Sequence, residues 1–150
     1  MSPTLILIAS RTSARFYTRH GMTKILSCVD EINNPEGRLQ ERELKSDRQG
    51  SNQDSVMMHD YSPQQTGVDR VSEDFAREVA KTLNAKLNES SYVNCYVVAE
   101  PNFLGKLRAQ MSKQDLLRCE IIAKDFAPLS QTEIADRLPL EKERIEPARN

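Results

Sequence analysis

Hydrophobic positions divide the chain into three parts, and the first part predicts strands. A continuous apolar run from Thr4 to Ser10 is typical of a strand that is buried on both faces. Two further runs, Ala14 to Arg19 and Thr23 to Ile32, alternate or are rich in β-branched and aromatic residues. The connectors between them are short, and the second carries Gly21. We therefore expect an antiparallel meander of three strands.

The third part predicts helices that alternate with strands. One apolar stripe recurs every four residues, at Phe75, Val79, Leu83 and Leu87, and predicts a helix that Ser72 caps. The later elements are predicted in this order: a strand at Tyr92–Glu100, a helix capped by Asn102 that restarts at Ser112 with Asp115, a strand at Cys119–Phe126, and a short helix that the capping box Ser130 to Glu133 opens and Leu138 ends.

These elements predict the α/β class, with a single-domain sandwich around a mixed central sheet of about five strands. The domain extends over residues 4–138, and a charged tail follows at 139–150. Between the meander and the first long helix, the segment at about 34–70 opens with the turn signal NNPEG. Beyond a helical turn at Arg38 to Leu44 it sustains no period. We expect it to be a long mobile loop with a function.

Composition narrows the classes of partner and compartment. The charges of the 21 basic and 22 acidic residues among the 150 nearly cancel, so the net charge gives no sign of binding to DNA or another polyanion. A local basic patch is compatible with a net charge near zero. Cys28, Cys95 and Cys119 show no CxxC spacing, and we interpret them as buried small hydrophobes in a reducing compartment. Apolar runs are short. We expect a cytoplasmic location and no membrane insertion.

Motifs for common chemistries are missing from the sequence. It contains neither of the two glycine-rich motifs that bind nucleotide phosphates, and it contains no nucleophile elbow. Its two histidines, His20 and His59, are not close to a cysteine in sequence, as a zinc site would favour. We therefore expect no cofactor, no metal and no catalytic residue, and the balance is against an enzyme.

Basic residues in the helical regions are the candidate binding residues. Arg70, Arg77 and Lys81 lie on or before the first long helix, and Lys106 and Arg108 lie in the second helical region. Such side chains bind phosphate groups. The alternative is an ordinary solvated helix face, because acidic residues are interleaved with them.

The residues also suggest a family. The succession ARFYTR, NPEGRLQERELKSDRQG, FAREVAKTLN, VVAEPNFLGKLRAQMS and IAKDFAPLSQTEIADRL closely resembles the bacterial family of host attachment proteins, from about Leu5 to Leu138. That family in turn is similar to the middle domain of archaeal and eukaryotic peptide-chain release factors. The resemblance implies that Lys45 to Asp69 is a presentation loop, in the place of the catalytic Gly-Gly-Gln loop of those factors.

The predicted loop lacks Gly-Gly-Gln, so no catalytic role is transferred to it. Its candidate binding residues are Arg48, Gly50, Gln64, Gln65 and Gly67. We predict a non-catalytic module that binds the ribosome or structured RNA. One alternative is a protein-interaction factor that contacts another protein through residues 45–69 and influences host attachment indirectly. A weaker alternative is a hydrolase of peptidyl-tRNA-type esters.

Overall fold

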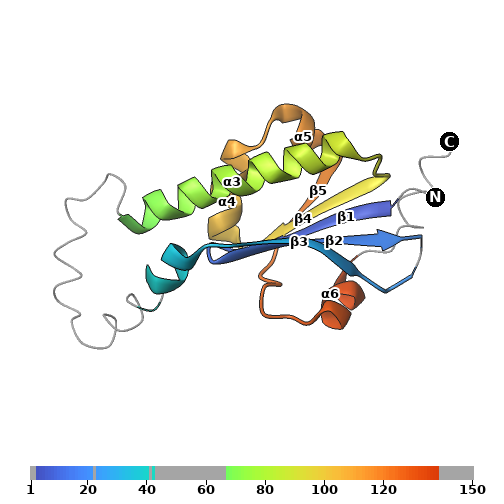
Figure 1. Cartoon of the computed structure of the whole chain (residues 1–150), viewed down its shortest axis with the longest axis horizontal. Coiled ribbons are helices and arrows are strands. Elements are labelled where there is room, and N and C mark those ends of the chain that lie inside the picture. The colour runs from blue at the N-terminus through green and yellow to red at the C-terminus, as the bar shows by residue number, and fades with distance from the viewer. Residues whose placement is uncertain (1–2, 22, 41, 43–66, 139–150) are drawn as a thin grey trace.

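The fold is a mixed five-stranded sheet with helices on both faces (Figure 1). It is seen in a computed structural model that describes residues 3–21, 23–40, 42 and 67–138. The elements are β1 (Pro3–Ala9), β2 (Ser13–His20), β3 (Ser27–Asn33), α3 (Gly67–Glu89), β4 (Asn94–Ala99), α4 (Pro101–Gln110), α5 (Lys113–Arg118), β5 (Cys119–Ala123) and α6 (Gln131–Arg137). This architecture confirms the predicted α/β class and the mixed sheet.

Strand β1 lies at the centre of the sheet. The strand order is β3-β2-β1-β4-β5, and β1 pairs antiparallel with β2 and parallel with β4. Its side chains alternate between the two faces, with Leu5 and Leu7 on one face and Ile6 and Ile8 on the other. All four are buried, as the continuous apolar run predicts.

Two layers of helices cover the sheet. Leu5 and Leu7 belong to a core that α3 and α4 complete, whereas Ile6 and Ile8 belong to a second core that α6 completes. Figure 1 shows α3, α4 and α5 on one side of the sheet and α6 on the other. Helix α3 contributes Phe75, whose ring centroid lies 6.0 Å from that of Phe103 on α4. The two helices therefore form one packed layer.

The prediction that Ser72 caps the first long helix is wrong. Helix α3 begins at Gly67, and Ser72 is a buried residue within it. Serine is only mildly unfavourable inside a helix, so packing decides its conformation there. Residues 35–40 are also helical, so the predicted loop at 34–70 has helix at both ends. Its central part lies outside the described residues.

Three predicted strands are shorter in the structure, and β4 is one of them, because it covers Asn94–Ala99 instead of Tyr92–Glu100. Strand β3 begins at Ser27 instead of Thr23, because the Thr23 hydroxyl donates to the His20 carbonyl and accepts from the Ile25 amide. These local hydrogen bonds form a turn in place of sheet pairing. Strand β5 ends at Ala123, and the chain then leaves the sheet so that Phe126 packs in the core under α6.

Helix caps follow the sequence pattern except at α4. Ser112 caps α5, and Ser130 with Glu133 forms the predicted capping box of α6. The cap of α4 is Glu100 instead of Asn102. Because Pro101 favours the first helical position, the helix begins two residues earlier than predicted.

The cysteines are divided between the core and the surface. Cys95 and Cys119 are buried, and they lie opposite each other on β4 and β5. A hydrogen bond with Cys119 and burial raise the pKa of the Cys95 thiol, so Cys95 stays protonated and behaves as a hydrophobe. Cys28 is exposed, which contradicts its predicted burial, because it lies on the edge strand β3.

One ion pair joins α3 to the edge of the sheet. Lys86 Nζ lies 3.1 Å from Asp30 Oδ2 on β3, and the same ammonium lies 5.3 Å from the centre of the Phe16 ring. The side chain of Lys86 is 19% exposed, so this contact is less screened by solvent than the other three ion pairs of the described residues. It fixes the last turn of α3 over β2 and β3.

We expect Leu83→Ala to lower the free energy of unfolding by about 2–5 kcal/mol, because it opens a cavity under α3. The matched control is Leu117→Ala, because Leu117 is 86% exposed and Leu83 is fully buried. That control should change stability by less than about 0.5 kcal/mol. Urea unfolding followed by circular dichroism measures both, and equal effects would contradict the packing of α3 on the sheet.

We expect the Lys86 ion pair to stabilise the fold in a pH-dependent manner. The hydrogen bond from Lys86 holds the pKa of the Asp30 carboxyl below its usual range, against the smaller effect of burial. The stabilisation is therefore present above the unfolded-state pKa of about 3.9 and is lost as the pH falls through the folded-state pKa.

Asp30→Asn should lower the free energy of unfolding at neutral pH by about 0.5–1 kcal/mol. The difference from the wild type should shrink as the pH falls through the lowered folded-state pKa of Asp30. Urea unfolding across this pH range tests the expectation. A difference that does not change with pH would show that the carboxylate charge is not involved.

Candidate functional site

A groove lies between α3 and the α4–α5 segment, with a volume of about 390 Å³. We call it the α3–α5 groove. Its lining residues are Arg77, Ala80, Lys81, Asn84, Gln110, Ser112 and Asp115. A volume of this size falls within the range of roughly 300–1,000 Å³ that small-molecule sites occupy. The groove is therefore large enough for a ligand group.

The periodicity of α3 determines which of its residues line one side of the groove. Arg77, Lys81 and Asn84 are separated by four and three residues, so they lie on the same side of α3. They flank the buried stripe that contains Val79 and Leu83. As a result, the same periodicity that buries α3 also lines the groove with polar side chains.

The other side of the groove is formed where α4 ends and α5 begins. Helix α4 ends at Gln110, and the chain restarts as α5 because the Ser112 side chain accepts a hydrogen bond from the Asp115 amide at 3.1 Å. Gln110, Ser112 and Asp115, at or next to this turn, line the groove from the α4–α5 side.

Asp115, the most buried of the lining residues, forms the floor of the groove and belongs to a chain of hydrogen bonds. The Asn88 side-chain amide donates to Asn84 Oδ1 at 3.1 Å, and Asn84 Nδ2 donates to Asp115 Oδ2 at 2.8 Å. Asp115 is only 2% exposed. Because both ends of the Asn84 amide are engaged, its orientation and that of the Asp115 carboxylate are fixed.

Positive charge gathers at the rim. Arg77 is exposed and pairs with Asp74 at 3.0 Å, and among the described residues Lys81 makes no ion pair. Arg108 and Lys113 are also exposed, on either side of Gln110 and Ser112 in the chain. Residues 101–118 carry four basic residues and one acidic residue, the buried Asp115. The solvent-facing charge of α4 and α5 is therefore basic.

The structure brings only some of the predicted binding residues together. Arg77 and Lys81 line one groove, and Arg70 and Arg108 are exposed on the same helical layer. The Lys106 ammonium lies 3.7 Å from Asp69 Oδ1, at the smaller pocket described below, so part of its charge is offset. Gly67 is the first residue of α3. The loop residues lie outside the described part and stay predictions: Arg48, Gly50, Gln64 and Gln65.

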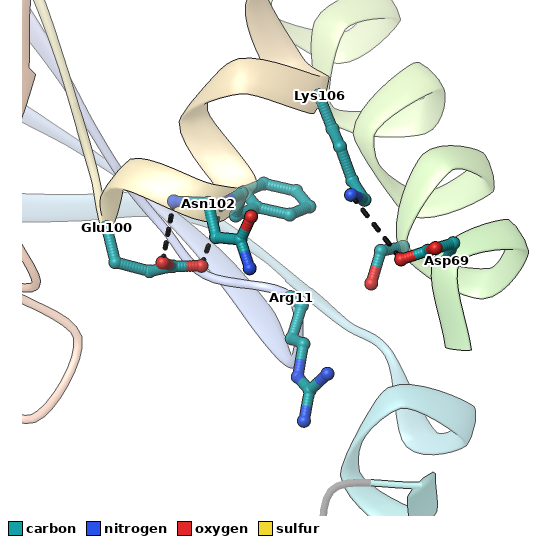
Figure 2. Close-up of a pocket in the computed structure, with 7 residues that line it drawn as sticks. Arg11, Asp69, Glu100, Asn102 and Lys106 are labelled. Atoms are coloured by element: carbon teal, nitrogen blue, oxygen red, sulfur yellow. Dashed lines mark hydrogen bonds and ion pairs between the residues drawn. The ribbon is translucent and has the colours of Figure 1, made fainter. Parts of the chain in front are cut away.

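A second, smaller pocket lies at the carboxyl ends of β1 and β4 (Figure 2). Its volume of about 30 Å³ exceeds the roughly 10–15 Å³ that one water molecule needs. Figure 2 shows Arg11 below Asn102, with the Lys106–Asp69 ion pair to the right of both. The carboxyl ends of strands are the usual ligand positions of open α/β sheets. Here the space is much smaller than in the α3–α5 groove.

Glu100 in this pocket has a structural role. Its two carboxylate oxygens accept the backbone amides of Asn102 and Phe103 at 2.9 and 2.8 Å. The carboxylate therefore caps α4, and its hydrogen bonds hold it against the helix instead of toward a substrate. Over the residues that the structure describes, no three His, Cys, Asp or Glu side chains are grouped as a metal site requires.

Sequence reasoning did not identify Arg11, Asn84, Gln110 and Asp115 as site residues. Arg11 lies two residues after the buried strand β1, and a position near the carboxyl end of a strand could have identified it from the sequence. Asn84 and Asp115 are 31 residues apart and carry no such signal, because only the packing of α3 on α5 joins them.

The family comparison agrees with the resemblance seen in the residues. A family model described as protein required for attachment to host cells matches residues 5–138. The search of curated proteins gives no match. In the described part of the chain, no helix is both long and apolar enough to cross a bilayer.

We expect Glu100→Ala to lower the free energy of unfolding by about 0.5–2 kcal/mol, because two amides of α4 lose their acceptor. Glu100→Asp keeps a carboxylate at the cap and should lose less. Chemical denaturation of the three proteins measures the difference. If Glu100→Ala had the stability of the wild type, the capping role would be wrong.

Proposed function

The chain belongs to the family of proteins required for attachment to host cells, and from this premise we propose that it is a non-catalytic, cytoplasmic module that binds structured RNA or the ribosome. The proposal includes a relationship to the middle domain of peptide-chain release factors. In this proposal the helical layer of α3, α4 and α5 contacts the phosphate groups of RNA. An effect on host attachment then follows indirectly, from the RNA that the module binds.

The observation that supports this proposal is the arrangement of cations around the α3–α5 groove. Arg77 and Lys81 line it, and Arg108 and Lys113 are exposed beside it. The acidic residue of the α4–α5 segment is buried beneath them. Phosphate contacts from Lys and Arg supply most of the affinity of non-specific nucleic-acid binding.

The opposite face of the protein offers a contrast. Lys24 forms an exposed ion pair with Asp136 of α6, at 3.3 Å. Residues 124–138, which include α6, carry two basic and three acidic residues. Helices α3, α4 and α5 together carry eight basic and six acidic residues, so charge favours an RNA contact on this face over the α6 face, and the difference makes the proposal testable by substitution.

We expect the protein to bind ribosomes and structured RNA with an affinity that falls steeply with salt. Each phosphate contact releases counterions, so log K should fall with log salt by about 0.7–0.9 for each cation that contacts a phosphate. The double variant Arg77→Gln, Lys81→Gln should weaken binding and reduce this slope by about 1–2. Co-sedimentation with ribosomes and filter binding of structured RNA across a salt series measure both quantities.

The control is Lys24→Gln. Lys24 and Arg77 have nearly equal side-chain exposure, 58% and 59%, and both make ion pairs with exposed aspartates. The control should leave binding and slope unchanged. Absence of binding at low salt would overturn the proposal and favour a protein partner. Binding that both variants weaken equally would place the contact elsewhere on the protein.

A further inference from the structure

The floor of the α3–α5 groove holds a carboxylate with an unused acceptor. Asp115 is 2% exposed, and its Oδ2 accepts from Asn84 at 2.8 Å. Its Oδ1 makes no hydrogen bond with any residue that the structure describes. None of those residues forms an ion pair with it within 4 Å. Oδ1 is not one of the enclosed side-chain atoms that lack a partner, so it is open to solvent, and an N–H group of a ligand can take the place of water there.

The rim of the same groove favours the opposite charge. Arg77 and Lys81 lie on its α3 side, above the carboxylate floor. A ligand that fits both features carries an anion at one end and a neutral N–H donor at the other. A lysine or arginine side chain from a protein partner would meet the carboxylate, but these two cations would repel it.

A nucleotide with an exocyclic amino group has this chemistry. Its phosphate pairs with cations at the rim, and its amino group donates to the carboxylate below. Aspartate accepting from the cytosine N4 amino group is a known base contact. Uracil carries an oxygen acceptor at the same position, so a carboxylate there repels it. Unstacked bases of single-stranded RNA are the ones that proteins read in this manner.

We propose that the α3–α5 groove binds one unstacked cytidine of an RNA strand, with Asp115 accepting from its N4 amino group. This inference rests on the proposed RNA-binding function, because the cations at the rim bind an RNA phosphate in the inference as well as in the proposed function. It adds base selectivity to a contact that phosphates alone leave non-selective. Asn84 has a positioning role, since its hydrogen bond orients the carboxylate.

The test compares short, labelled oligocytidylate and oligouridylate by fluorescence anisotropy at one salt concentration and neutral pH. The wild-type protein should prefer oligocytidylate by about 5- to 20-fold, within the range for one good base contact. Asp115→Asn keeps the size of the side chain but replaces one acceptor oxygen with a donor. It should remove the preference or reverse it toward oligouridylate.

Asp136→Asn on α6 is the control, because it removes an exposed carboxylate on the opposite face and should keep the preference. Circular dichroism and thermal unfolding check that Asp115→Asn is folded. The wild-type comparison of the two oligomers needs no variant, so it tests the inference even if that variant fails to fold.

The outcomes separate the inference from the proposed function. A preference for cytidine that Asp115→Asn abolishes supports both. Equal, salt-sensitive binding of the two oligomers overturns the cytidine contact and leaves RNA binding standing. A preference that survives Asp115→Asn also overturns the inference, because another residue then reads the base. Absence of binding to either oligomer and to structured RNA overturns the proposed function and the inference together.

Discussion

Burial of β1 on both faces is the constraint on which the remaining structure depends. Its backbone is paired on both edges, by β2 and β4, and its side chains point alternately into two cores. Neither face of such a strand can remain in water without exposing a row of leucines or isoleucines. The chain therefore needs helical layers on both sides of the sheet. The parallel pairing with β4 also requires the crossover that α3 supplies.

The groove follows from how the upper layer is assembled. Helix α3 runs the length of the sheet, and α4 covers only part of it before the chain turns at Met111 and Ser112 (Figure 1). The turn leaves a step between α4 and α5 beside the longer helix. Polar residues line this step because it lies at the margin of the core. Asp115 becomes buried there because its backbone belongs to the first turn of α5 while its side chain lies under Asn84.

Sequence patterns predicted the elements whose periodicity records burial, and missed those that depend on tertiary contacts. The apolar run of β1 and the stripe of α3 are local records of core packing, so both were identified. Helix α3 begins at Gly67, because helical hydrogen bonding extends to the N-terminal side of Ser72. The preference of serine for capping positions does not reveal this extension. The exposure of Cys28 depends on the strand order, which no local pattern contains.

The candidate site shows the same division more sharply. Arg77 and Lys81 were identified because a basic side chain on the solvent side of a helix is a local feature. The near-zero net charge argued against a polyanion partner, yet it averages over two faces of different composition. Charges interact over a Debye length of about 8 Å at physiological ionic strength, which is shorter than the separation of the two layers across a sheet. A partner that approaches the α3–α5 groove therefore experiences the charges of α3, α4 and α5, eight basic and six acidic residues, and not the net charge of the whole chain. Burial of Asp115 strengthens this asymmetry, because it withdraws a negative charge from the surface while keeping it available to a group that enters the groove.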